Sequence, residues 1–347
     1  MMKWWLKYCF SIIAAVGVSF SIYGQDAQFS QQMASPLWIN PAMSGADGFL
    51  RGALNYRTQW NAVSDPFTTV AGSFDIALNQ RPNPRKRKKG NPGLGVLFLA
   101  DRAGSPITRR TKIMLSGAYH VNLNENSSLG AGINAGYETL ALDAGSGKWG
   151  SQYNGMQYDP SIAHGENLQS VQQTSMDVGG GVVFVYRRKA NTRYDIKRSE
   201  VTIGLAGYQL GRVMLSEQNL FAANDDIRFS GFANAAFGVG NSGSALEPAV
   251  YFHRQGASQM LLAGASYRHV FSSGTSLIRE SKTISMALGA FYRFGDAAIA
   301  RLSFRWEGLE IGLSYDINTS RLSKYSSGQG AMEVSLCYRL AAPSYRR

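Results

Sequence analysis

The chain has 347 residues with a formal net charge of +12, and 17% of its residues are charged. Its 38 glycines, its 10 prolines and its 12% of aromatic residues are typical of many strands joined by tight turns. This composition disfavours a mainly helical protein, which would contain more alanine, leucine, glutamate and lysine.

The N-terminus has the pattern of a secretory signal peptide. Lys3 and Lys7 precede an 11-residue apolar stretch, residues 10–20, and small residues follow it. This stretch is too short to cross a bilayer as a helix, and no later apolar run is long enough either. We expect residues 1–24 to be removed on export. Cys337 is then the single thiol, which excludes an intramolecular disulfide framework and a cysteine-based zinc site.

The next segment, residues 25–48, fits neither regular element. Its central stretch, QFSQQMASPLWINPAMSG (residues 28–45), contains Pro36 and Pro41, which interrupt a helix. Its apolar residues do not alternate as they would in a strand. It contains no metal-binding cluster and no phosphate-binding loop, so its role has to be inferred from the rest of the chain.

From residue 49 onwards, apolar residues recur with a period of two. In the last such segment, MEVSLCYRL, apolar side chains alternate with Glu333, Ser335 and Cys337. The segments with this pattern are residues 49–61, 66–79, 92–102, 109–123, 128–142, 174–187, 200–213, 229–240, 245–254, 259–271, 282–294, 297–306, 309–319 and 330–341. An even number of strands closes an antiparallel barrel with both termini on one side.

The length of these segments favours a membrane barrel over the alternative, a soluble β-sandwich. Most run for ten to fifteen residues, whereas sandwich strands usually have about five or six. Tilted strands that cross an outer membrane need about 9–11 residues. We therefore predict an all-β fold, an antiparallel transmembrane β-barrel of about 14 strands over residues 49–342. Aromatic residues near segment ends predict interface girdles: Trp60, Phe98, Tyr119, Tyr137, Tyr186, Tyr208, Tyr292, Trp306 and Tyr338.

Two basic runs are expected in loops on the periplasmic side of the barrel. They comprise Arg85, Lys86, Arg87, Lys88 and Lys89, and Arg187, Arg188 and Lys189. The sequence leaves two interpretations open: solvated turns, or docking loops that steer an acidic periplasmic partner. Nucleic-acid binding is disfavoured for an exported protein.

No pattern predicts catalysis, a metal or a cofactor. The four histidines lie on separate segments without the spacing of a metal site, and a G-x-S-x-G elbow is absent. The glycine-rich stretches GLGVLF and VGGGVVF lack the strand-to-helix context of a nucleotide-binding loop. We interpret these glycines as strand positions that need close packing or curvature, and we predict a non-enzymatic protein.

Several blocks of the chain resemble one family. QFSQQMASPLWINPAMSG is followed by LNYRTQW (residues 54–60), and GLGVLFLADRAG and LEPAVYF come later. The closing block is GLSYDINTSRLSKYSSGQGAMEVSLCYRL (residues 312–340). Together these blocks resemble the PorP/SprF family, outer-membrane proteins of the Bacteroidetes type IX secretion system. The residues that carry the resemblance and are candidate partner-docking or structural positions are Phe29, Pro36, Trp38, Asn40, Pro41, Arg57, Trp60, Tyr315 and Asp316.

The resemblance implies an outer-membrane location and a role in export or surface anchoring of proteins with C-terminal secretion domains, including adhesins for gliding motility. It implies outer-membrane lipid, other secretion components and secreted proteins as partners, and no cofactor. The alternative from the residues alone is an outer-membrane pore for small solutes, because about 14 strands enclose a wide lumen.

For residues 25–48 we expect a short rigid segment at the periplasmic mouth or inside the lumen, with its aromatic residues packed against the barrel wall. It either closes the pore in part or presents a docking surface, or else it only seals the edge of the first strand.

Overall fold

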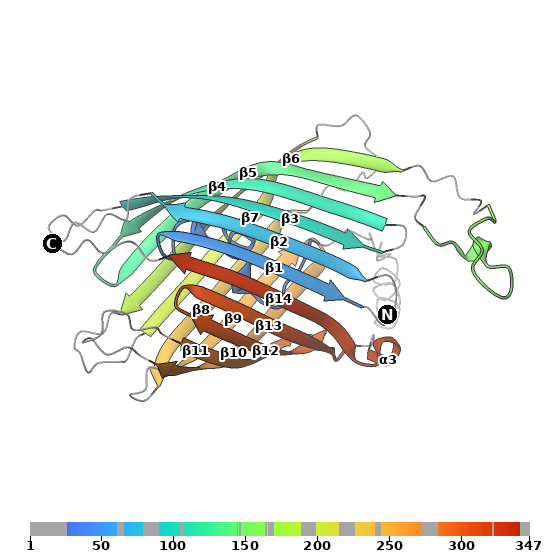
Figure 1. Ribbon diagram of the computed structural model, residues 1–347. Coiled ribbons are helices and arrows are strands. Elements are labelled where there is room, and N and C mark those ends of the chain that lie inside the picture. Colours follow the sequence, from blue (N-terminus) through green and yellow to red (C-terminus); the bar gives the residue numbers. More distant parts are fainter. Residues whose placement is uncertain are drawn as a thin grey trace, which may run out of the picture.

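The computed structural model is a closed antiparallel barrel of fourteen strands (Figure 1). The structure describes residues 26–60, 66–78, 90–104, 107–143, 145, 147–163, 165, 170–188, 199–214, 226–239, 244–272, 284–320 and 323–340. The strands are β1 (Leu50–Gln59), β2 (Phe67–Ala77), β3 (Gly90–Ala103), β4 (Ile107–Asn122), β5 (Ser127–Asp143), β6 (Val171–Arg188), β7 (Ser199–Met214), β8 (Arg228–Val239), β9 (Ser244–Gln255), β10 (Ser258–Ser272), β11 (Ile284–Arg293), β12 (Ala297–Trp306), β13 (Leu309–Asn318) and β14 (Gln329–Leu340). The predicted fold class is confirmed, and every predicted segment corresponds to one of these strands.

Each strand pairs with its neighbours in the sequence, and β1 closes the barrel against β14. The closing register runs from Leu50 opposite Leu340 to Gln59 opposite Ala331. We call the end where β1 begins and β14 ends the near end, on the left of Figure 1, and the opposite end the far end. Because β1 pairs with β2 on its other side, it has no free edge. The expectation that the N-terminal segment only seals this edge is therefore wrong.

The alternation of side chains places apolar residues outside and polar residues in the lumen. On β14, Glu333 and Ser335 are 0% and 6% exposed, whereas Met332 and Leu336 are 50% and 40% exposed. In water the outward face would be an extensive apolar surface, and in a bilayer it is matched by lipid. This pattern confirms the predicted two-faced strands.

One predicted girdle position is wrong. Tyr208 is 2% exposed and points into the lumen, whereas Trp306 and Tyr338 lie on the outer face as expected. On β7, Thr202 and Ala206 face the lumen and Tyr208 continues this inward series, so the period of two itself places Tyr208 inside although it lies near the end of a predicted segment. The irregularity of β7 comes directly after it: Gln209 has φ 59° and also faces inward. A bulge of this kind puts two consecutive side chains on one face, which a strict period of two does not anticipate.

The remaining described elements are short. Two lie outside the barrel wall, η4 (Gly150–Gln152) and α3 (Ser323–Ser326). The connector between β5 and β6, which includes η4, projects beyond the far end (Figure 1). Three single helical turns lie between Asp26 and the start of β1: η1 (Gln32–Ala34), α2 (Pro36–Ile39) and η2 (Pro41–Met43). In the described part of the chain, no helix has the length and apolar character needed to cross a membrane.

Candidate functional site: the luminal plug

Residues Asp26–Asp47, which we call the plug, are packed inside the lumen. Pro36 and Pro41 each occupy the first turn of a short helix, where the missing N–H and the fixed φ of proline are favourable. Asn40 separates the two turns and caps the second, since its side-chain oxygen accepts a hydrogen bond of 2.8 Å from the Ala42 N–H. The prolines thus start helical turns and prevent one continuous helix.

The plug and inward-facing residues of the barrel wall together form the hydrophobic core. Phe29, Leu37 and Trp38 are at most 2% exposed, and they contact inward-facing side chains such as Leu97 and Val183. Burying a side chain of this size contributes about 1.5–3 kcal/mol. A lumen lined only by the alternate residues of the strands would leave these apolar surfaces in contact with water.

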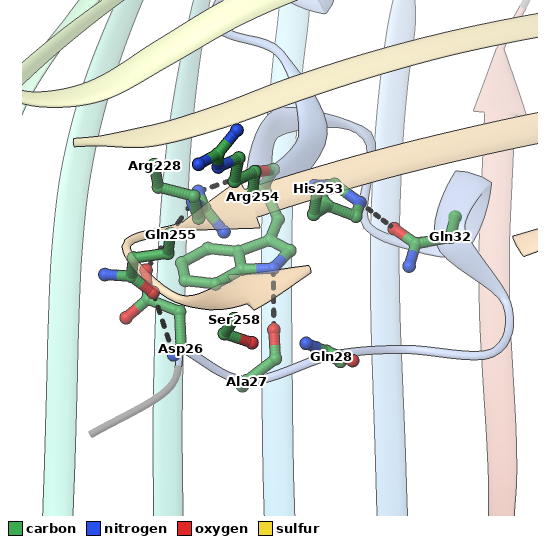
Figure 2. Close-up of a pocket in the computed structure, with 10 residues that line it drawn as sticks. Asp26, Ala27, Gln28, Gln32, Arg228, His253, Arg254, Gln255 and Ser258 are labelled. Carbon is green, nitrogen blue, oxygen red and sulfur yellow. Dashed lines mark hydrogen bonds and ion pairs between the residues drawn. The ribbon is translucent and has the colours of Figure 1, made fainter. Parts of the chain in front are cut away.

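A cluster of buried charges holds the start of the plug toward the far end. The carboxylate of Asp26 accepts hydrogen bonds from Arg110 and, at 2.9 Å, from Lys112 Nζ, and it lies 3.5 Å from Arg228 Nε. Its backbone N–H donates to Gln255 Oε1 at 3.2 Å. Figure 2 shows Asp26 beside Gln255 in a small pocket of this region. The carboxylate of Asp26 thus joins the plug to β4 and β8, and its backbone N–H joins it to β9.

Trp38 completes this cluster through its ring. The guanidinium of Arg228 lies 3.8 Å from the centre of the Trp38 ring, and Lys112 Nζ lies 5.3 Å from it. The indole N–H donates to the Ala27 carbonyl at 3.1 Å. The ring therefore contacts two cations of the barrel wall, and its N–H ties Trp38 to the chain next to Asp26.

A second cluster holds Ser30 and Gln31 of the plug, also toward the far end. Arg57 Nη1 donates to Ser30 Oγ at 2.6 Å and to Glu333 Oε2 at 3.1 Å, and Arg57 Nη2 donates to Asp316 Oδ2 at 3.0 Å. Arg293 Nη2 also donates to Asp316, at 2.9 Å. The two oxygens of Glu333 accept the backbone N–H groups of Ser30 and Gln31 at 2.6 and 2.9 Å. This cluster unites β1, β11, β13 and β14 around the plug.

Asn40 connects the plug to the opposite wall. Its amide nitrogen donates to the backbone oxygens of Val182 at 2.9 Å and Leu205 at 3.1 Å. These oxygens belong to adjacent strands, β6 and β7, and Asn40 is 0% exposed. A buried amide with every polar atom paired favours a single position of the plug.

The end of the plug is attached toward the near end. Asp75 Oδ1 accepts the Gly45 N–H at 2.9 Å, and Asp75 Oδ2 pairs with Arg51 Nε at 2.7 Å. Asp47 lies 3.3 Å from Arg187 and 3.1 Å from Arg339. The plug therefore extends through the lumen from the far end toward the near end, where β1 begins.

The predicted basic residues are only partly described. Arg85, Lys86, Arg87, Lys88, Lys89 and Lys189 lie outside the described residues, as does the predicted signal peptide, residues 1–24. Arg187 and Arg188 are the last residues of β6 rather than part of a loop. Arg187 Nε donates to Glu200 at 2.7 Å and its Nη1 to the Ala46 carbonyl at 3.2 Å. These bonds hold the Arg187 side chain against the plug at the near end of the barrel.

The candidate positions separate into two groups. Phe29, Pro36, Trp38, Asn40, Pro41, Arg57 and Asp316 are brought together in the lumen. Tyr315 is 45% exposed on the outer face of β13. Trp60 follows β1 at the far end, where its ring packs edge-on against Phe67 at 4.6 Å.

Sequence reasoning did not single out Asp26, Arg228, Arg293 or Glu333 as site residues. The sequence pattern indicates only that Glu333 lies on the polar face of its strand. It does not indicate the partners of Glu333 in the plug, which are 302 and 303 residues away in the sequence. Within the described residues, no group of three or more His, Cys, Asp or Glu side chains could hold a metal ion.

The plug requires close backbone contact with the wall at Gly132. A Cβ atom on this inward-facing residue of β5 would lie 2.7 Å from the backbone of Ala42. We expect Gly132→Ala to destabilise the packed plug by about 1–3 kcal/mol, because backbone atoms on both sides have to move apart. Limited proteolysis at the plug would then become faster. Gly117→Ala is the control, because its Cβ would meet only Leu94 Cδ2, at 3.9 Å. Equal proteolysis of both variants would contradict the expectation.

The attachment of Asp26 predicts a definite response to pH. Burial alone would raise the pKa of Asp26, but the cations of Lys112, Arg110 and Arg228 outweigh burial and hold this pKa below its usual range. Such a carboxyl stabilises the folded state fully above its unfolded pKa of about 4 and loses this contribution as the pH falls through the lower, folded-state value.

We therefore expect hydrogen exchange in the plug to be protected equally from about pH 7 to 5, with protection lost only below about pH 4. Asp26→Asn should reduce protection at neutral pH and remove most of this acid dependence. Asp159→Asn, at an exposed position of the β5–β6 connector, should change neither the protection of the plug at neutral pH nor its acid dependence. Loss of protection already between pH 7 and 5 in the unmodified protein would contradict this role of Asp26.

Solved structures with similar folds are bacterial barrels of low sequence identity. The toluene transporter TbuX of Ralstonia pickettii is 11% identical, with a TM-score of 0.45 over 88% of this chain and 93% of that chain. A Pseudomonas aeruginosa FadL homologue is 11% identical, with a TM-score of 0.42 over 86% and 92%. BamA of Haemophilus ducreyi lacking POTRA domains 1–3 is 11% identical, with a TM-score of 0.41 over 83% and 70%. No curated protein matches the sequence.

The family comparison covers nearly the whole chain. Residues 21–338 match the family described as type IX secretion system membrane protein PorP/SprF, so the match includes the plug and almost every strand. A closed barrel with an apolar outer face is the architecture of outer-membrane proteins. The chain is an outer-membrane β-barrel that belongs to the PorP/SprF family of type IX secretion system membrane proteins.

Proposed function

We propose that this protein is a non-catalytic, plugged barrel that supports export or surface anchoring of proteins with C-terminal secretion domains. The observation that carries the proposal is the plug, attached by buried charges at Asp26, around Arg57 and at Asp75. A barrel whose lumen is occupied along its length is suited to docking partners at its two ends. It is less suited to the alternative, a pore for small solutes.

The two ends offer different surfaces for partners. With the strand termini on the periplasmic side, the near end would face the periplasm and present the predicted basic loops to other secretion components. The far end would face outward. There the β5–β6 connector projects beyond the wall (Figure 1) and exposes Tyr153 and Met156, at 57% and 91%. Exposed aromatic and methionine side chains favour a protein contact at this end. Outer-membrane lipid would surround the apolar wall.

A chromosomal deletion tests the proposal. The secreted, surface and periplasmic proteomes of the deletion strain are compared with those of a strain complemented by the full chain. We expect proteins with C-terminal secretion domains to leave the surface and collect in the periplasm. Loss of many would indicate a core component, and loss of one would indicate a dedicated partner. Unchanged secretion together with reduced uptake of a solute would overturn the proposal and favour the pore.

A further inference from the structure

The lumen contains a second feature that the plug does not fill. A cavity of about 590 Å³ lies between the plug, at Met33 and Asp47, and the wall formed by β7 to β14. Most of its lining residues belong to the near-end halves of these strands. Its volume lies in the range of small-molecule sites, about 300–1,000 Å³. Small inward side chains, among them Ser266, Ser285 and Ser303, leave this space open.

The rim of the cavity is an ion-pair network whose charges are matched. Glu310 accepts hydrogen bonds from Arg268 at 3.0 Å, Arg305 at 2.8 Å and Arg339 at 3.0 Å. Arg268 also pairs with Glu247 at 2.7 Å. Further along the rim, Arg339 and Arg187 pair with Asp47, and Arg187 pairs with Glu200. The four arginines of this network face four carboxylates, so the rim itself has no cation left over.

Arg301 is the surplus cation of the cavity. Its side chain lines the cavity from β12, and it has no hydrogen bond or ion pair with the part of the chain that the structure describes. Its guanidinium carbon lies 6.0 Å from the centre of the Phe291 ring. A partly buried guanidinium with five donors and no acceptor is a site for an anion. Its planar fork matches a carboxylate.

The surroundings of Arg301 are apolar on one side and carry paired charges on the other. Tyr251 and Phe291 are 3% and 6% exposed and line the cavity together with Met33 and Ala249. On the rim, Glu247 and Glu310 are already paired with arginines, so the charge of Arg301 is left to balance one negative charge of a ligand. The site therefore suits one negative charge attached to an apolar group, and it disfavours a phosphate dianion.

We propose that this cavity binds a monoanionic amphiphile, whose carboxylate pairs with Arg301 while its apolar part packs against Tyr251 and Phe291. The same chemistry occurs in a free organic acid and in the C-terminal end of a polypeptide chain with an apolar last residue. The inference goes beyond the proposed function and does not require it, because it concerns a ligand of the purified barrel.

Calorimetric titration of the full chain in lipid nanodiscs tests this site. The probes are indole-3-butyrate for the free acid and an acetylated tripeptide ending in phenylalanine for the chain end. Each is compared with its amide, which has the same shape without the charge. We expect saturable binding of at least one acid, with its amide at least about tenfold weaker. Binding of the indole acid alone assigns the free-acid source, and binding of the tripeptide alone assigns the chain end.

Arg301→Gln should abolish the preference for the acid over the amide. Arg254→Gln is the matched control, since it makes the same substitution at an exposed arginine of β9 that does not line this cavity, and it should keep the preference. Because Arg301 has no described ion pair, the thermal unfolding of Arg301→Gln should match that of the unmodified protein. Absence of saturable binding by both acids, equal affinity for acid and amide, or an unchanged preference in Arg301→Gln would overturn the proposal.

Discussion

Replacing Arg57 with alanine should destabilise the folded protein by about 3–5 kcal/mol. The guanidinium is 3% exposed and is shared between Asp316, Glu333 and Ser30 of the plug. Its removal leaves the Glu333 carboxylate, which is 0% exposed, without its cation. An uncompensated buried charge costs more than an exposed ion pair contributes.

Denaturant unfolding of the detergent-solubilised barrel measures this effect. Arg305→Ala provides the control, because Arg305 pairs with Glu310 at 2.8 Å but its side chain is 33% exposed, so we expect a loss of about 1 kcal/mol or less. Combining Arg57→Ala with Glu333→Gln should cost less than the sum of the two single changes, since the double variant removes the stranded charge. An unfolding midpoint for Arg57→Ala equal to that of the unmodified protein would show that this cluster does not hold the plug.

Deleting residues 26–46 should convert the closed barrel into an open channel. The hydrogen-bonded ring of strands is complete without the plug, because β1 pairs with β2 and β14. Barrels of about 8 strands are filled by their own side chains, whereas those of 16–18 leave an aqueous channel. Fourteen strands with small inward residues lie between these cases, so we expect water and ions to enter once the plug is gone.

Planar-bilayer recording measures this outcome as a stable open-channel current at low voltages, at which the full chain stays closed. A locked variant covers the case in which the deletion fails to insert. Ser44→Cys combined with Ser116→Cys joins the plug to β4 at a place where the two hydroxyl oxygens are 2.8 Å apart. Under oxidising conditions this variant should stay closed at voltages that open the unmodified chain. Current through the oxidised, locked variant equal to that through the unmodified chain at those voltages would mean that the plug does not close the lumen.

The strands were predictable because the signal for them is local. Lys112, Ser116 and His120 lie on the polar face of one predicted segment, and the structure places all three in the lumen against the plug. The boundaries differ by a few residues, for example Val171–Arg188 for β6 where residues 174–187 were predicted. The outward prediction for Tyr208 is wrong because it rests on the position of this aromatic residue near a segment end, whereas the alternation with Thr202 and Ala206 places Tyr208 in the lumen.

The sequence by itself determined the class of fold, the number of strands and which side chains face the lumen, because strand periodicity depends only on neighbouring residues. Only the tertiary structure decided which side chains meet in the lumen. Arg57 and Asp316 are 259 residues apart in the sequence, and they meet because β1 closes against β14 and pairs in one register. Asp26 reaches Arg110 and Lys112 because the plug extends through the lumen. Such contacts depend on the closure of the barrel and on the path of the plug through the lumen. No local sequence pattern encodes either of these.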